Sequence, residues 1–169
     1  MRVYAGIGSR ETPPEFREVM RALATALADE GWTLRSGHAP GADQAFESGA
    51  RGRAEVYLPW PEFGNEVEVV ASVILDRPTS GALNIAAAHH PAWDRLGRGA
   101  RLLHGRNTHI VLGRDCLPDE AVRFVVGWTP QAREVGGTAQ AIRLARYYGI
   151  EVFNLADPVH FRRVLAVTR

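Results

Sequence analysis

The first 60 residues alternate short apolar runs with helical stretches, and this alternation limits the possible folds more than any other feature. The runs at 2–7, 32–35 and 55–58 are rich in β-branched and aromatic residues, as buried strands are. Between them, apolar residues recur at helical spacing, and Gly31 is placed to end the first helix. Strands joined through a helix become parallel neighbours. The sequence therefore predicts an α/β protein with a Rossmann-like, open, mostly parallel sheet and helices on both faces.

The first helix is preceded by a capping sequence, Thr12-Pro13-Pro14-Glu15. Threonine is a frequent N-cap and proline suits the first helical turn. Glu15 follows Thr12 at the spacing of a capping box. We expect the Thr12 side chain to cap this helix.

The regular alternation stops after residue 60 and resumes near residue 121. Within 61–118 we expect helices at 66–75, 81–89 and 93–103 and a possible short strand at 108–113. Beyond this stretch we expect a strand at 121–128, a helix at 139–148, a strand at 151–155 and a helix at 158–166. We interpret 61–118 as a helical insertion within one domain that spans residues 1–169.

Composition restricts the cellular setting and the class of partner. The formal net charge is +1, so any basic surface must be local. No apolar run reaches about 18 residues and the N-terminus has no signal-peptide pattern, so we expect neither a membrane span nor export. The single cysteine, Cys116, cannot form an intramolecular disulfide, which fits a reducing, cytoplasmic location. We expect Cys116 to be an ordinary thiol.

Four loops at one predicted edge of the sheet carry small or polar residues. They occupy 8–10, 36–43, the stretch from Pro59 onward, and 128–138. In open parallel sheets, ligands bind outside the carboxyl ends of the strands, near the point where the strand order reverses. We therefore expect a binding site at this edge.

Two common nucleotide-binding motifs are absent from these loops. The first loop reads GIGSRE, so Glu11 stands where a dinucleotide fingerprint needs its third glycine. The second strand ends in RSG at 35–37, without an acid for a ribose, and no G-x-x-x-x-G-K-[ST] sequence occurs. We therefore expect neither an NAD-dependent dehydrogenase nor a P-loop NTPase, and no cofactor. We also expect no catalytic metal, because the histidines at 89–90 match no metalloprotease pattern.

Two glycine-rich segments each open a predicted helix at this edge. They are SGHAPGAD at 36–43 and GGT at 136–138. Backbone amides at a helix start attract anions, and glycines let a ligand approach them. Either segment alone is explained equally well as a tight turn with a helix cap, in which Asp43 or Thr138 is the N-cap. Two such segments at one edge favour phosphate binding, with Asp43 able to accept from a ribose hydroxyl.

Aromatic and basic residues near this edge leave two alternatives open. Trp128 stands just past a predicted strand end, where it either stacks on a base or packs in the core. Arg95, Arg98 and Arg101 recur along one flank of a predicted helix. They form either a track for phosphates or an ordinary solvated face.

In their order along the chain, these segments resemble the SLOG superfamily, which joins LOG-type cytokinin-activating proteins with the DNA-processing protein A (DprA/Smf) family. The blocks that carry the resemblance are GIGSRETP, SGHAPGADQAFESGA, LPW, LHGRN, GWT and GGTAQAIRLARYYGIEVFNL. Within the superfamily, the chain looks like the DprA-like Rossmann proteins of bacteriophages and bacteria. The resemblance implies a Rossmann-like homo-oligomer that binds nucleotides, nucleotide-derived signals or nucleic acid.

The resemblance also implies ligand-binding residues in four of these blocks. They are Gly8, Ser9 and Arg10; Ser36, Gly37, Gly41, Ala42 and Asp43; Gly136, Gly137 and Thr138; and Arg106 and Asn107. LOG enzymes carry P-G-G-x-G-T-x-x-E, whose final Glu serves N-glycosidic cleavage. Here Val135 replaces the proline, the spacing is G-G-T, and residues 139–142 supply no acid.

Cleavage of a ribose–base bond needs a carboxylate near the sugar. The candidates near the predicted edge are Glu11, Asp43, Glu47 and Glu134. Glu47 lies one turn after Asp43, so both could face the site from one helix, and the alternative for Glu47 is a solvated helix position. We expect a binder or sensor of a nucleotide or of single-stranded nucleic acid. The alternative is a hydrolase of the N-glycosidic bond of a nucleoside monophosphate.

Overall fold

The computed structural model describes residues 2–134 and 136–168, in which six strands form one parallel sheet. The strands are β1 (Val3–Gly8), β2 (Thr33–Ser36), β3 (Ala54–Tyr57), β4 (Val73–Leu75), β5 (Phe124–Trp128) and β6 (Glu151–Asn154). The helices are α1 (Pro14–Asp29), α2 (Ala42–Gly49), α3 (Ser80–Ala88), α4 (Arg98–Leu112), α5 (Gly136–Tyr147) and α6 (Pro158–Leu165). The predicted α/β class with a Rossmann-like sheet is confirmed.

The strand order β4-β3-β2-β1-β5-β6 creates a switch point between β1 and β5. From β1 the chain runs outward through β2 and β3 to β4, and it then returns to add β5 and β6 on the other side of β1. Ala5 of β1 accordingly pairs with Arg35 on one side and with Val125 on the other. The loops after β1 and β5 therefore lead to opposite faces of the sheet, which opens a crevice for a ligand between them.

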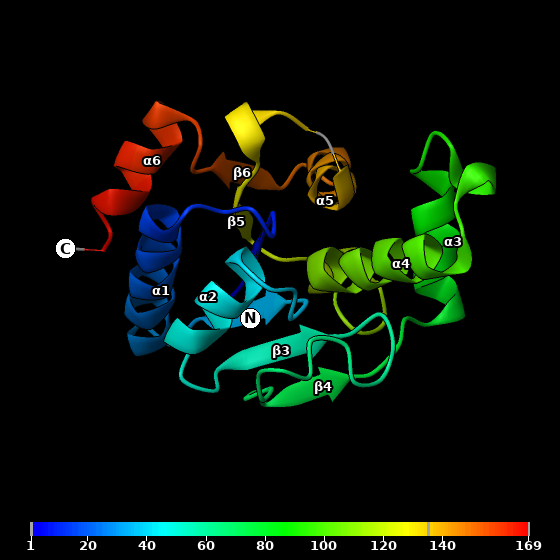
Figure 1. The fold of residues 1–169 in the computed structure, drawn as a ribbon, viewed down its shortest axis with the longest axis horizontal. Helices are drawn as coiled ribbons and strands as arrows, with labels where there is room; N and C mark the ends of the chain where they lie inside the picture. The colour runs from blue at the N-terminus through cyan, green and yellow to red at the C-terminus, as the bar shows by residue number, and fades with distance from the viewer. Residues whose placement is uncertain (1, 135, 169) are drawn as a thin grey trace.

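Each face of the sheet has its own set of helices (Figure 1). Tyr4 joins the core formed with α1, α2 and α6, whereas Val3 and Ala5 join the core formed with α4 and α5. Gly6 faces α2, and a Cβ there would lie 2.5 Å from the Phe46 ring, so glycine lets this helix pack directly on the strand. In the described part of the chain, none of these helices has both the length and the apolar character needed to cross a bilayer.

Two expected elements in the stretch 61–118 are wrong. The predicted helix at 66–75 is instead a loop that ends in β4, which pairs with β3 as the edge strand. The predicted strand at 108–113 belongs to α4, which continues to Leu112 and is buried from His104 onward. The stretch therefore supplies an edge strand and then the two helices, α3 and α4, through which the chain crosses from β4 to β5.

The predicted cap of the first helix is also wrong. Pro13 occupies the N-cap position of α1, and no side chain there bonds to the helix. The hydroxyl of Thr12 instead donates to the carbonyl oxygen of Ser9 at 2.6 Å. Thr12 therefore closes the loop after β1 and does not cap the helix. Gly31 does follow the helix end in the left-handed conformation, as predicted.

Candidate ligand-binding site

A cavity of about 580 Å³ lies at the carboxyl end of the sheet, between the loops that leave β1 and β5. This volume is typical of small-molecule sites. Nine of the predicted binding residues line the cavity, and they are Gly8, Ser9, Arg10, Asp43, Arg106, Asn107, Gly136, Gly137 and Thr138. Segments that are far apart in the sequence thus meet at the switch point, which is where the strand pattern predicted a binding site.

Six other predicted site residues lie outside the lining of this cavity: Ser36, Gly37, Gly41, Ala42, Glu47 and Trp128. Several of them support its walls. The buried Ser36 hydroxyl donates to the carbonyl oxygen of Gly6 at 2.9 Å. Gly41 has a φ of +96°, and a Cβ there would lie 2.8 Å from the carbonyl oxygen of Arg10. Gly41 therefore lets the loop before α2 touch the loop after β1.

Trp128 packs against the core. Its ring centroid lies 5.9 Å from that of Phe16, and it borders the cluster that includes α1 and α6. Its backbone carbonyl accepts a hydrogen bond from the amide of Ser9 at 3.0 Å. Of the two alternatives for Trp128, the structure thus shows core packing, with the backbone of this residue tying the β5 end to the first loop.

The first loop presents Arg10 at the cavity while its backbone is held in place. The Ser9 hydroxyl accepts from the amide of Glu11 at 3.1 Å. Arg10 is exposed, and its guanidinium carbon lies 5.9 Å from the centroid of the buried Phe63 ring. The guanidinium of Arg106 lies 5.8 Å from the same ring. Phe63 therefore contacts both arginines of the cavity, a role that its sequence position did not indicate.

The glycine pair at the start of α5, Gly136 and Gly137, also lines the cavity. The helix begins at Gly136, so Thr138 lies inside its first turn and the predicted N-cap role is wrong. Gly136 has a φ of +75°, which favours glycine. At Gly137 an added Cβ would meet no atom of the described residues within 4 Å. Because the first amides of a helix lack intrahelical partners, this bare turn offers hydrogen-bond donors to the cavity.

Asn107 fixes the position of that turn. Its side-chain amide donates to the carbonyl oxygen of Gly137 at 3.0 Å. Asn107 is buried on α4, whose packing against the sheet sets where the side chain lies. The start of α5 is therefore held against α4 across the cavity wall.

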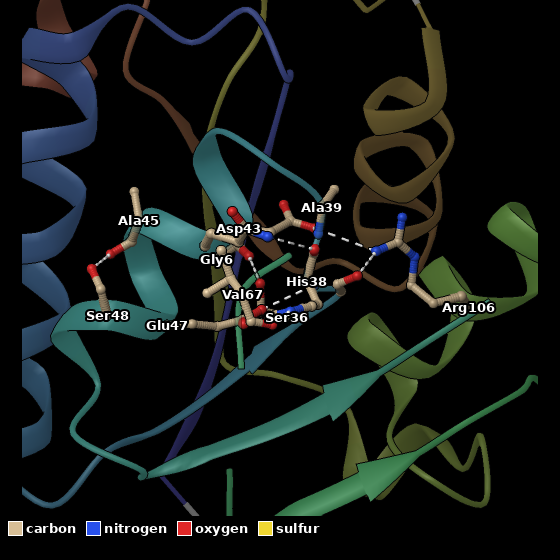
Figure 2. A network of polar contacts seen from close by, with 12 residues as sticks. Gly6, Ser36, His38, Ala39, Asp43, Ala45, Glu47, Ser48, Val67 and Arg106 are labelled. Carbon is tan, nitrogen blue, oxygen red and sulfur yellow. Dashed lines mark hydrogen bonds and ion pairs between the residues drawn. The ribbon is translucent and has the colours of Figure 1, made fainter. Parts of the chain in front are cut away.

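Arg106 reaches from α4 to the loop before α2 and pairs there with Asp43 (Figure 2). Its Nη1 donates to the carbonyl oxygen of Gly37 at 2.6 Å and to Asp43 Oδ2 at 3.3 Å. Asp43 also accepts from the amide of Ala39 at 3.3 Å, whereas the N-cap position of α2 belongs to Gly41. Asp43 is therefore not the N-cap residue of α2. Its carboxylate instead binds the amide of Ala39 in the preceding loop and the guanidinium of Arg106.

Burial controls the ionisation of Asp43. It raises the pKa of this carboxyl to about 6, against the lowering effect of the Arg106 guanidinium. Glu47, one turn away on α2, adds to the increase. An acid that lines a cavity and titrates near neutral pH is a typical functional-site residue.

Glu47 and His38 form a separate buried pair, also shown in Figure 2. Glu47 accepts from the backbone amide of His38 at 2.9 Å and lies 2.5 Å from its Nδ1. On the other side of the ring, Nε2 lies 3.0 Å from the carbonyl oxygen of Val67 and must donate to it. The pair is almost fully buried, with side chains 1% and 8% exposed. Glu47 is therefore not the solvated residue that its helix position allowed, and it points to His38 instead of the cavity.

The remaining charged candidates are dispersed. Glu11 lines the cavity, whereas Glu134 pairs with Arg146. Arg101 stacks on Trp93 with its guanidinium 5.5 Å from the ring centroid. No group of three or more His, Cys, Asp or Glu side chains in residues 2–134 and 136–168 is placed to hold a metal ion.

Cys116 should react slowly with alkylating agents. Burial raises the pKa of its thiol to about 11. The adjacent His109 uses Nδ1 toward the carbonyl oxygen of Gly113 at 3.0 Å and accepts from the amide of Thr79 at Nε2, so the ring is neutral and does not stabilise a thiolate. With iodoacetamide at pH 7.5, mass spectrometry should show labelling at least tenfold slower than for glutathione, and denaturant should remove the difference. Labelling at the glutathione rate in the folded state would contradict this assignment.

No protein-family model and no curated protein matches the chain. Among solved structures, the chain is similar to DNA processing protein A from Helicobacter pylori, whose structure describes a mode of single-stranded DNA binding. The two are 20% identical with a TM-score of 0.61, over 98% of this chain and 72% of that one. The Moco carrier protein from Chlamydomonas reinhardtii is 18% identical with a TM-score of 0.55, over 98% and 83% of the two chains. The shared feature is a Rossmann-like fold.

Proposed function

We propose that the protein binds a nucleotide or a nucleic-acid phosphate in the cavity between β1 and β5. The observation that carries the proposal is the bare helix start at Gly137. Within the described residues, neither a positive φ nor close packing calls for glycine there. A glycine that structure does not require, at a helix N-terminus that lines a cavity, is suited to the close approach of an anion.

Two arginines and the similar structures support this assignment. Arg10 and Arg106 line the same cavity, and arginine matches phosphate geometry with two parallel donors. Of the proteins with similar solved structures, DNA processing protein A binds single-stranded DNA and the Moco carrier protein carries a cofactor. With the resemblance of its motifs, this makes the chain, in our proposal, a SLOG-type binder or sensor of the phage and bacterial DprA-like group. We propose that it acts in the cytoplasm as a homo-oligomer.

A thermal-shift screen tests the proposal. A ligand that binds only the folded protein raises its apparent stability, by about 2.7 kcal/mol at a concentration of 100 Kd. Nucleotides and short single-stranded oligonucleotides should shift the melting temperature, and free bases should not. Absence of a shift with every nucleotide and oligonucleotide would remove the support for this function.

Gly137→Ala should weaken phosphate binding about tenfold without loss of stability. The methyl group would project toward the ligand over the amides, where each anion contact contributes about 0.3–1 kcal/mol and more when partly buried. Stability should stay the same or rise, because alanine is the better helix former. Titration calorimetry with the ligand found in the screen measures the first effect and thermal melting the second.

Gly99→Ala is the matched control for this variant. Gly99 is also the second residue of its helix, with no atom of the described residues near an added Cβ, and it does not line the cavity. The control should keep full affinity. If both variants lose affinity equally, or if neither variant loses affinity, the result contradicts the binding of a phosphate at the start of α5.

A second candidate function is hydrolysis of the N-glycosidic bond of a nucleoside monophosphate. The observation in its favour is Asp43, a cavity carboxyl whose pKa of about 6 suits acid–base chemistry. The protein is incubated with AMP and related monophosphates, and free base is measured by chromatography. Base release that disappears in Asp43→Asn would establish the hydrolase, whereas binding alone leaves the nucleotide intact.

A further inference from the structure

The charged side chains of the cavity cancel one another. Among the described residues, its lining contains the cations Arg10 and Arg106 and the anions Glu11 and Asp43. Arg10 and Glu11 are exposed, so solvent screens both of them. Arg106 and Asp43 are buried and paired with each other. The site thus gives a ligand little net positive charge beyond the roughly half charge of the α5 N-terminus.

Arg106 and Asp43 lie side by side in the cavity wall. Both line the cavity, and the Arg106 guanidinium pairs with Asp43 Oδ2 at 3.3 Å. A phosphate that binds at the guanidinium therefore also lies close to the Asp43 carboxylate that shares it.

A second ligand charge at this position would meet that carboxylate in a buried setting. Two like charges about 4 Å apart repel by about 4 kcal/mol near a protein surface, and by more in the interior. Asp43 is ionised above its pKa of about 6. Against the roughly half charge of the helix start, a singly charged phosphate leaves about half a negative charge unbalanced, whereas a doubly charged phosphate leaves about one and a half.

We infer that Asp43 determines the charge of the ligand, so that the site selects a phosphodiester, with one negative charge, over terminal phosphate esters with two or more. The inference rests on the proposed function and narrows its ligand class. The shared chemistry is a phosphate with two ester bonds to sugar oxygens, which a cyclic mononucleotide, a dinucleotide and a single strand all contain.

Titration calorimetry at pH 8 without divalent cations tests the inference. One set of ligands contains diesters: 3′,5′-cyclic AMP, the dinucleotide ApA and a tetranucleotide without terminal phosphate. The other set contains AMP, ATP and the uncharged adenosine. The wild-type protein should bind at least one diester tenfold or more tightly than AMP and ATP. The tightest diester then identifies the source of the phosphate.

Asp43→Asn should reduce or reverse this preference. Its side-chain oxygen can still accept from Arg106 and from the amide of Ala39, so these two hydrogen bonds remain while the negative charge is lost. AMP should gain at least tenfold in affinity, while diesters change less. Glu15→Gln is the control, because this exposed acid does not line the cavity and should shift AMP affinity by less than threefold.

The possible results separate the charge preference from phosphate binding itself. Wild-type protein that binds AMP or ATP as tightly as every diester overturns the inference and leaves phosphate binding intact. Adenosine that binds as tightly as the diesters, or no binding by any of the six ligands, overturns the proposed function as well. If Asp43→Asn does not fold, the wild-type comparison still decides the charge preference.

Discussion

Glu47→Gln is expected to lower the free energy of unfolding by about 3 kcal/mol at pH 6. The substitution removes the charge that faces His38, whose side chain is only 1% exposed. Loss of one partner from a buried ion pair is strongly destabilising, by about 3–5 kcal/mol, because the other charge stays buried without compensation. We expect the lower end, since glutamine still accepts one hydrogen bond and His38 can lose its proton. Urea unfolding measures the change.

The pH dependence of this effect has a defined sign. The hydrogen bond that the His38 ring donates to Glu47 raises the pKa of His38 above its ordinary value of about 6.5, in spite of burial. A raised folded-state pKa adds stability that is complete below the unfolded-state pKa and is lost as the pH rises through the folded-state value. The difference between wild type and Glu47→Gln should therefore shrink above pH 6.5. Repulsion between ionised Asp43 and Glu47, present only in the wild type, acts in the same direction.

Glu18→Gln is the control for Glu47→Gln. Glu18 pairs with Arg21 at 2.8 Å, but its side chain is 68% exposed, and surface pairs contribute about 0–1 kcal/mol. If both variants lose equally little stability, the His38–Glu47 pair does not stabilise the fold. Because Glu47 does not line the cavity, folded Glu47→Gln should retain ligand affinity within twofold. If the wild-type protein releases base from a nucleoside monophosphate, loss of that activity in a fully stable Glu47→Gln variant would instead make Glu47 a catalytic residue.

The fold was predictable where the chain has a strong local pattern. The strands β1, β2 and β3 are short apolar runs between glycine-containing turns, and burial on both faces explains their composition. The edge strand β4 lacked this signal, because it has three residues and its Ile74 is half exposed. The last turns of α4 have no exposed face, since residues 104–112 are all buried, so the usual alternation of polar and apolar faces is missing and the β-branched residues there resembled a strand.

The candidate site was predictable in part for the same reason. Glycines that open a helix are a local signal, so the loops with Gly8 and Gly137 were identified from the sequence. The contact of Arg106 with Gly37 spans 69 residues, and the stacking of Phe63 against two arginines depends on the packing of separate loops. Such contacts arise only when the tertiary structure forms. No spacing along the chain distinguishes them from ordinary surface positions.

Gly37→Ala should produce the largest combined loss of stability and of ligand binding. A Cβ at this position would overlap the Arg106 guanidinium, which occupies the space that glycine leaves. The φ of Gly37 is not positive, so alanine adds no backbone strain and the effect falls on Arg106. Overpacking costs about 1–3 kcal/mol, and the lost charge-assisted hydrogen bond to the Gly37 carbonyl adds about 1.5–3 kcal/mol. We expect a total of about 3 kcal/mol in urea unfolding.

Displacement of Arg106 should also change the electrostatics of the cavity. Asp43 would lose the cation that lowers its pKa, so its pKa should rise above about 6, and a ligand would lose the guanidinium beside its phosphate. We expect affinity for a phosphate ligand to fall at least tenfold, and the pKa of Asp43 is measured by carboxyl NMR titration.

The double variant Gly37→Ala/Arg106→Ala identifies the cause of the loss of stability. Without the guanidinium the methyl group has nothing to overlap, so the double variant should be no less stable than Arg106→Ala. Additive losses would mean that Gly37 serves the loop backbone, and that Arg106 is placed by α4 alone.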